Sequence, residues 1–167
     1  RTKNVGIVKG SKVEHIAPSG NMVKGLMNDL FTYLKKDEDL ILIKSCVFHY
    51  EFEFIHPFID GNGRIGRLWQ TLILMQQYPV FEYLPIENLI KENQAEYYKV
   101  LSQSDKLGSS TPFIEFMLGI ILQSLENLLK TQNRTLTSET RIELYKDIIG
   151  SNEFSRKDYL QNFKEIS

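Results

Sequence analysis

The segment from residue 40 to residue 55 constrains the fold more than any other part of this 167-residue chain. From Leu40 to Ile55 the residues are apolar almost all round a helix. A helix that is apolar on every side has to be covered by other elements, so we expect it to be the central helix of a helical bundle. Pro57 should end it, because the residue before a proline is disfavoured in the helical region.

Amphipathic helices are expected around this central helix, because apolar residues recur at helical spacing on both sides of it. Pro85 and Thr111-Pro112 favour helix starts, since a proline fits the first turn and a threonine can cap it. The expected helices cover residues 22–34, 64–78, 85–107 and 111–130, and the second should bury Ile65, Leu68, Trp69, Leu72, Ile73 and Met75.

The two ends of the chain differ from this helical middle. Residues 5–8 and 12–16 flank Gly10-Ser11, which suits a type II′ turn, so we expect a short β-hairpin. The polar residues 131–133 close a first domain, 1–133, and leave an appendage, 134–167. In the appendage, a helix over 141–149 and a second one led by Ser155 are similar to an incomplete winged helix.

Charge and cysteine content exclude several classes of protein. The chain has 20 basic and 21 acidic residues, a formal net charge of −1, which gives no electrostatic attraction to nucleic acid or anionic lipid. Residues 131–167 carry six of each sign, so DNA binding is not expected there either. The apolar segments carry charges that argue against a membrane span, and the single Cys46 fits a reducing, cytoplasmic location.

The most informative segment is the loop after the central helix, His56-Pro-Phe-Ile-Asp-Gly-Asn-Gly-Arg-Ile-Gly-Arg67. Asp-Gly followed by Asn-Gly favours a tight bend whose amide groups can converge on an anion ahead of the next helix, although a plain interhelical turn gives the same pattern. Arg64 and Arg67 lie at the positive end of that helix, where cations are unfavourable by about 0.3 to 1 kcal/mol. A bound polyphosphate would offset this, and so would acidic groups elsewhere in the protein.

Two further side chains of the loop suit phosphoryl chemistry. Asp60, beside bound phosphates, would need a cation between them, and Mg²⁺ is commonly held by one or two carboxylates together with substrate phosphates. His56 is placed to accept a proton from a nucleophile. Taken singly, Asp60 could be a helix cap and His56 a buried polar residue, and His49, seven residues earlier, is expected to be a packing residue.

These residues resemble the Fic family signature, His-Pro-Phe-x-Asp/Glu-Gly-Asn-Gly-Arg-x-x-Arg, at every specified position. The resemblance continues from the hairpin through Glu53-x-Ile55 and Tyr97-Tyr98-x-x-Leu101 to Phe113-Ile-Glu-Phe116, about 125 residues. It implies a mainly α fold, a Fic-type helical bundle with a β-hairpin flap. It also implies a protein adenylyltransferase, which moves AMP from ATP to a Ser, Thr or Tyr hydroxyl of a target protein.

The resemblance also implies roles for individual residues. His56 would be the general base, Asp60 would hold Mg²⁺, and Phe58 would be a buried anchor of the loop. The phosphates would be bound by Gly61, Asn62 (with its side chain), Gly63, Arg64 and, at the γ end, Arg67. Tyr97, Tyr98 and Leu101 would border the adenine or else be core residues. The flap that aligns the target would include Val5, Gly6, Ile7, Val13, Glu14 and His15.

Alternatives stay open at this point. The same site could remove AMP from a protein or transfer another nucleotide-linked group, and a nucleotide-controlled binding module without catalysis is the alternative from another class. Many Fic proteins carry an inhibitory Ser/Thr-x-x-x-Glu-Gly/Asn helix. The nearest match, Thr111 to Phe116, lacks the final residue, so that helix could lie in an N-terminal segment outside this sequence. The target, the oligomeric state (a homodimer among the options) and the role of the appendage are not readable.

Overall fold

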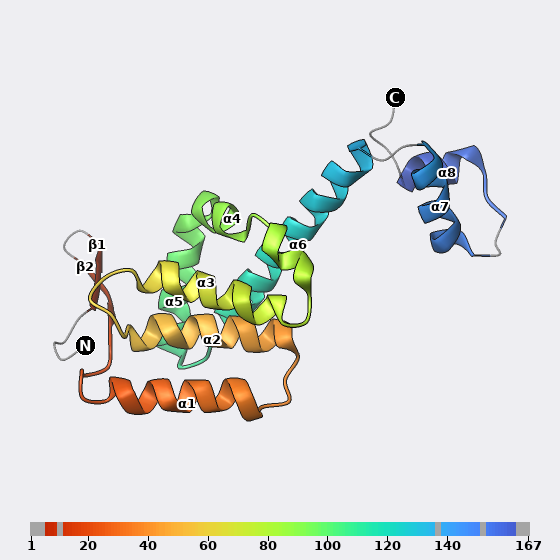
Figure 1. Cartoon of the computed structure of the whole chain (residues 1–167). Coiled ribbons are helices and arrows are strands. Elements are labelled where there is room, and N and C mark those ends of the chain that lie inside the picture. Colours follow the sequence, from red (N-terminus) through yellow and green to blue (C-terminus); the bar gives the residue numbers. More distant parts are fainter. Residues whose placement is uncertain (1–5, 10–11, 136–137, 151–152, 163–167) are drawn as a thin grey trace. The chain divides into compact units, whose positions relative to one another are not determined.

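The computed structural model describes residues 6–9, 12–135, 138–150 and 153–162. These residues are mainly helical, as predicted, and the chain divides into two compact units, Arg1–Leu122 and Gln123–Ser167 (Figure 1). The predicted boundary after residue 133 lies farther along the chain than this division, within helix α6 (Thr111–Thr135).

The first unit is a bundle built around α2 (Ile41–Ile55). In Figure 1, α2 lies between α1 (Val23–Lys36) and α3 (Asn62–Met75), and it contacts both. Phe48, Phe52 and Ile55 of α2 are at most 2% exposed, which confirms that this helix is the centre of the bundle. The remaining elements of the unit are the 3₁₀ helix η1 (Pro79–Tyr83), α4 (Ile86–Glu92), α5 (Gln94–Leu107) and the first part of α6.

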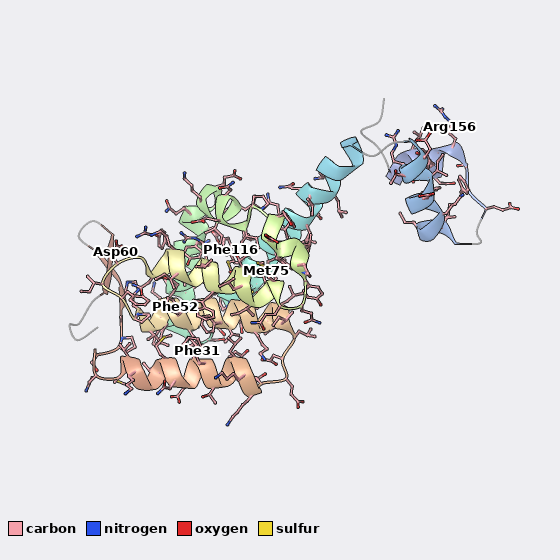
Figure 2. The ribbon with its side chains drawn as sticks, viewed as in Figure 1. Phe31, Phe52, Asp60, Met75, Phe116 and Arg156 are labelled. Atoms are coloured by element: carbon pink, nitrogen blue, oxygen red, sulfur yellow. The ribbon has the colours of Figure 1, made fainter. Side chains whose placement is uncertain are left out.

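Aromatic packing joins the three layers of this core. The Phe31 ring of α1 lies 5.7 Å from the Phe48 ring of α2 and 5.5 Å from the Trp69 ring of α3. Figure 2 labels Phe31 and Phe52, on α1 and α2. The ring centroids of Phe48 and Trp69 are 5.4 Å apart, and Phe48 also stacks on Phe52. Because such pairs add about 0.5 to 1.5 kcal/mol each beyond burial, the layers are fixed against one another. They hold the two helix ends that flank the candidate site.

Two details predicted for helices 64–78 and 85–107 were wrong: the burial of Leu68 and Leu72, and the continuity of the second helix. Leu68 and Leu72 of α3 are 57% and 44% exposed, because α3 turns its other side toward α2. The expected helix 85–107 is broken into α4 and α5 at Asn93, whose backbone and side-chain N–H groups both donate to the Leu89 carbonyl. That cap ends α4 and lets α5 start in a new direction.

The strands β1 (Gly6–Lys9) and β2 (Lys12–Ile16) pair antiparallel, with an irregular register between Ile7 and Val8. The expected turn residues Gly10 and Ser11, and Val5 before the first strand, lie outside the described residues. The two strands and the loop between α2 and α3 lie at the same end of the first unit (Figure 1).

Helix α6 is long and apolar enough, over residues 111–130, to meet the length and composition criteria for a membrane span. Four of its residues in the first unit, Phe113, Met117, Ile120 and Ile121, are buried, and 28% of the apolar window as a whole is buried. The predicted absence of a membrane span stays a prediction, because this helix meets the criteria by length and composition.

The second unit contains the end of α6, α7 (Ser138–Ile149) and α8 (Arg156–Asn162). Gly150, at φ 59°, ends α7, and the Ser155 hydroxyl and the Asp158 carboxylate cap α8 reciprocally. The two short helices expected after residue 138 are therefore confirmed, while the likeness to a winged helix stays a prediction. Tyr145, 3% exposed, packs on the rings of Phe154 and Tyr159 and forms the centre of this small unit.

Candidate active site

The predicted loop joins the end of α2 to the start of α3, and its two ends have left-handed backbone conformations. His56, the C-cap of α2, has φ 51°, and Gly61, the N-cap of α3, has φ 85°. A non-glycine residue in this region costs about 1 to 2 kcal/mol, so His56 is held there by its surroundings. Its backbone N–H still donates to the Phe52 carbonyl, which fixes the imidazole at the end of a rigid helix.

The side chain of Asn62 closes this loop. Its oxygen accepts from the Phe58 backbone N–H at 2.9 Å and its nitrogen donates to the Phe58 carbonyl at 2.9 Å. Asn62 is only 2% exposed, and its side chain shapes the loop through these two bonds, while the predicted contact of this side chain with phosphate stays a prediction. Its backbone N–H lies in the first turn of α3, where amides lack intrahelical acceptors and suit an anion.

Phe58 was predicted to be a buried anchor, and this is wrong, because its residue is 47% exposed. One face of the ring packs on Phe52, with centroids 6.2 Å apart, and the backbone is held by Asn62. The loop is therefore anchored by the Asn62 amide and not by burial of the phenyl ring.

The imidazole of His56 has a defined proton arrangement. Its Nδ1 lies 3.3 Å from the Glu53 carbonyl oxygen. A carbonyl can only accept a hydrogen bond, so in the neutral ring Nδ1 carries the proton and Nε2 presents a lone pair. This is the tautomer that a general base needs.

Arg64 and Asp60 form an exposed pair at the N-terminus of α3. The guanidinium lies 3.5 Å from the Asp60 carboxylate, with side chains 72% and 92% exposed. Such a pair contributes at most about 1 kcal/mol and exchanges readily for another charged partner. Both groups therefore remain accessible to phosphates and a metal ion.

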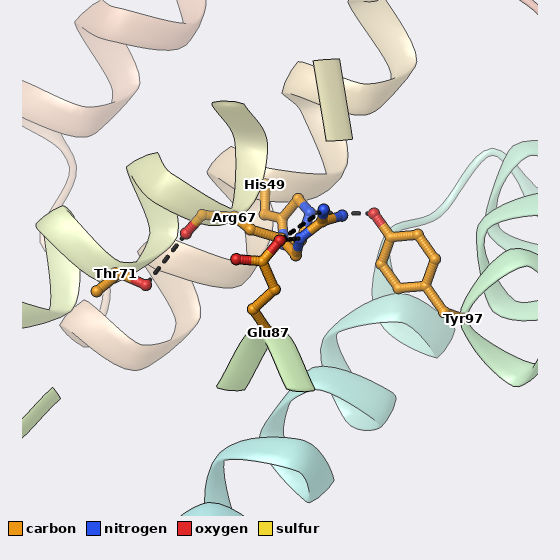
Figure 3. A network of polar contacts seen from close by, with 5 residues as sticks. All are labelled: His49, Arg67, Thr71, Glu87 and Tyr97. Carbon is orange, nitrogen blue, oxygen red and sulfur yellow. Dashed lines mark hydrogen bonds and ion pairs between the residues drawn. The ribbon is translucent and has the colours of Figure 1, made fainter. Parts of the chain in front are cut away.

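Arg67 has a different environment, because its side chain is only 22% exposed. Its Nε and one terminal nitrogen donate to the same Glu87 oxygen of α4, at 3.3 and 3.0 Å. Tyr97 of α5 lines the same pocket as the guanidinium. Figure 3 shows Arg67 among Glu87, His49 and Tyr97. A phosphate at Arg67 would therefore have to replace Glu87.

A buried polar network lies under Arg67. His49 is fully buried, with Nδ1 2.7 Å from Gln70 Oε1 and Nε2 3.1 Å from the Tyr97 hydroxyl. Burial lowers the pKa of His49 to about 4 and raises the pKa of Tyr97 well above its usual value. His49 is therefore a buried packing residue, as predicted, and it also makes two hydrogen bonds that the sequence did not indicate. Spacing alone could not show a bond to a residue 48 positions later.

A pocket of about 230 Å³ opens beside Arg67. Tyr98, 38% exposed, lines it, and so does the edge of the buried Tyr97. Leu101, predicted to border the adenine, is 8% exposed in the core and does not line this pocket. The structure thus brings the two tyrosines to Arg67 and leaves Leu101 aside. The complete lining is Arg67, Glu87, Ile90, Lys91, Gln94, Tyr97 and Tyr98.

Gly63 and Gly66 let the polar groups of α2 and α3 approach closely. A Cβ on Gly66 would lie 2.9 Å from both Glu53 Oε1 and His49 Cδ2, and one on Gly63 would lie 3.2 Å from a terminal nitrogen of Arg67. Gly66 was not among the predicted site residues. Its place at a position the signature leaves unspecified gave no signal.

No cluster of three or more His, Cys, Asp or Glu side chains suited to a metal ion occurs within the described part of the chain. Asp60 is the exposed carboxylate of the loop. One carboxylate is enough for Mg²⁺ when phosphates and water complete its coordination, so the loop fits such an ion only together with a bound nucleotide.

The fold and the loop define a helical domain with a candidate anion site between a buried helix and its neighbour. The Fic/DOC family model matches residues 1–74, which contain the whole loop, and the predicted resemblance to the Fic family is confirmed. A crystal structure of a Fic family protein from Desulfovibrio desulfuricans G20 superposes with a TM-score of 0.75 at 42% identity, covering all of this chain and 50% of that one.

Several curated relatives carry the name protein adenylyltransferase. Protein adenylyltransferase fic-1 of Caenorhabditis elegans is 29% identical over 127 residues, 68% of this chain and 24% of that protein. Protein adenylyltransferase Fic of Nematostella vectensis is 32% identical over 108 residues, 62% of this chain and 24% of that protein. The chain thus spans about a quarter of the length of these two relatives.

Proposed function

We propose that this chain is the catalytic part of a protein adenylyltransferase, which transfers AMP from ATP to a hydroxyl side chain of a target protein. The observation that carries the proposal is the His56 imidazole. Its Nδ1 donates to the Glu53 carbonyl, which makes Nε2 the basic atom of the neutral ring, at the end of α2 where the anion-binding loop begins. The names of the relatives support the same activity.

In this reaction the target hydroxyl attacks the α-phosphorus of ATP, and the bond to pyrophosphate breaks. His56 Nε2 takes the hydroxyl proton. The first-turn amides of α3 and Arg64 would hold the phosphates, and Arg67 the γ end, so that charge on the leaving pyrophosphate is neutralised. The rigid ends of α2 and α3 would keep these groups in place, and the chain supplies orientation as well as charge.

Mg²⁺ would be held by Asp60 and the nucleotide phosphates. When bound, the ion supplies charge neutralisation on the phosphates. In the chain itself Asp60 pairs with Arg64, and that exposed contact is weak enough to give way.

The target protein would be aligned by β1 and β2. A two-stranded sheet leaves edges to which an extended segment can add as a further strand, and backbone hydrogen bonds then place the attacking hydroxyl. We propose this for Gly6, Ile7, Val13, Glu14 and His15, in the cytoplasm, where the free Cys46 would stay reduced.

The function is tested by incubating the chain with labelled ATP, Mg²⁺ and a lysate. Mass spectrometry should find an added AMP on a Ser, Thr or Tyr side chain. His56→Ala should lower the rate by about 10² to 10⁴, as expected for a general base, while ATP still binds in calorimetry.

Other outcomes identify the alternatives. ATP binding without product would favour a nucleotide-controlled binding module. Loss of AMP from a modified protein would favour the alternative in which the same site removes AMP. An unchanged rate for His56→Ala would refute the proposed base.

A further inference from the structure

The polar network under Arg67 has a fixed hydrogen-bond direction, which can be read from Gln70 outward. The Gln70 side-chain nitrogen donates to Cys46 Sγ at 3.5 Å, so its oxygen faces His49. An amide oxygen can only accept, and therefore His49 carries its proton on Nδ1. His49 Nε2 is then an acceptor.

The direction continues through Tyr97. Because His49 Nε2 accepts, the Tyr97 hydroxyl has to donate its only proton across the 3.1 Å contact. The oxygen of Tyr97 is left with lone pairs alone, and it lies beside the Arg67 guanidinium in Figure 3, where both residues line the same pocket. The hydrogen bonds of Gln70, His49 and Tyr97 thus all run in one consistent direction. Gln70 and His49 are at most 1% exposed, so water does not compete for these bonds.

This arrangement fixes one side of Arg67 and leaves the other side exchangeable. Tyr97 is 3% exposed and its ring packs on Phe113 and His49, so its hydroxyl cannot follow a moving guanidinium. The Glu87 side chain of α4 is 67% exposed, so it can move away from Arg67 into solvent. Tyr97 thus holds the orientation of Arg67, while a ligand can replace Glu87.

We propose that His49, oriented by Gln70, is a positioning residue that acts through the Tyr97 hydroxyl to aim Arg67 at the terminal phosphate of the nucleotide. This inference rests on the proposed function for the presence of a triphosphate at Arg67. It assigns His49, Gln70 and the Tyr97 hydroxyl no contact with the reacting atoms.

The first test reads the proton on His49 directly. Nitrogen-15 NMR of the neutral imidazoles, with the His49 signals assigned by their loss in His49→Asn, should show Nδ1 protonated and Nε2 bare. A proton on Nε2 would reverse the direction of the whole network and overturn the inference. This measurement needs no nucleotide and no activity.

The second test compares ATP with ADP by calorimetry in the presence of Mg²⁺. Tyr97→Phe keeps the ring but removes the acceptor, and it should weaken ATP about tenfold with little change for ADP, which lacks the γ-phosphate. Tyr50→Phe is the matched control, because it removes another buried tyrosine hydroxyl, bonded to Asp105, from the same core. It should leave both affinities unchanged. Equal losses for ATP and ADP in Tyr97→Phe would overturn the inference.

A double-mutant cycle tests whether Gln70 acts through Tyr97. Gln70→Leu alone should weaken ATP selectively by a few-fold, and it should have no further effect in the Tyr97→Phe background. Additive losses would overturn the relay. Wild-type chain that binds ATP but transfers no AMP would refute the proposed function alone, whereas chain that binds no ATP would refute both.

Discussion

At the scale of single residues, the state of Arg67 is the feature that most affects nucleotide binding. Its ion pair with Glu87 joins residues 20 positions apart and occupies the guanidinium that we expect to meet the γ-phosphate. Arg64 also has an internal partner, Asp60, but that contact is longer and more exposed. The nucleotide therefore has to displace two carboxylates, and the Glu87 contact is the stronger of the two by geometry.

Glu87→Gln should tighten ATP binding, because it removes the carboxylate that competes for Arg67. An ion pair this exposed contributes about 0.2 to 1 kcal/mol, so the dissociation constant should fall about 1.5- to 5-fold. Calorimetry at low and high salt measures this, and the gain should shrink as salt screens the pair.

Glu96→Gln is the control for the Glu87 variant. It removes the same charge from another exposed pair, Glu96 with Lys99 at 3.0 Å, and should leave ATP affinity unchanged. Weaker ATP binding by Glu87→Gln would mean that Glu87 helps to hold the nucleotide, contrary to this prediction.

At the scale of elements, the packing of α2 on α3 depends on Gly66. A methyl group there would lie 2.9 Å from the Glu53 carboxylate and the His49 ring, both held within the core. Gly66→Ala should therefore lower the free energy of unfolding by about 1 to 3 kcal/mol, as overpacking does, despite the better helix propensity of alanine. Urea unfolding measures this change.

Gly25→Ala is the matched control for Gly66→Ala. Gly25 also lies inside a helix, α1, but a Cβ there meets no heavy atom within 4 Å. This variant should be stabilised by about 0.5 to 1 kcal/mol. Equal effects of the two substitutions would show that α2 and α3 separate without cost at Gly66.

The sequence predicted the elements whose signals are local. The all-round apolar pattern identified α2, Pro57 placed its end, and the glycine-rich loop was found from its residues alone. The break at Asn93 was missed, because a side-chain cap on Leu89 overrides a continuous helical pattern. Leu68, Leu72 and Phe58 were expected to be buried, but periodicity does not say how far the neighbouring elements reach.

The contacts of the site could be predicted least. His49 with Gln70 and Tyr97, and Arg67 with Glu87, join residues on different helices, 20 to 48 positions apart. Their spacing carries no signal in one sequence, because it depends on how α3, α4 and α5 pack. The loop residues share one short segment, and for that reason they were found.

At the scale of the whole molecule, the two compact units can be followed separately. The chain has a single tryptophan, Trp69, and it lies in the core of the first unit, against Phe31 and Phe48. Its fluorescence therefore reports the unfolding of residues 1–122 without a contribution from a tryptophan in residues 123–167. Trp69 fluorescence can therefore measure how the buried His49 affects the stability of the first unit.

The first unit should lose stability in acid through His49. Burial, and to a lesser degree the charge of Arg67, lower the pKa of His49 from 6.5 to about 4 in the folded state. The unfolded chain therefore binds a proton that the folded chain refuses. Stability is complete above about pH 6.5 and is lost as pH falls toward 4, by about 2 kcal/mol between pH 7.5 and pH 5. Urea unfolding followed by Trp69 fluorescence at these two pH values measures the difference.

Two variants separate His49 from the other groups that titrate in this range. His49→Asn removes the titrating ring, so its stability should be lower at pH 7.5 but should change by about 2 kcal/mol less than that of the wild type between the two pH values. His56→Ala, which alters a partly exposed imidazole at the end of the same helix, should keep the acid sensitivity. If His49→Asn retained the full pH dependence, other groups would have to destabilise the first unit in acid, and a neutral buried His49 would no longer be needed to explain it.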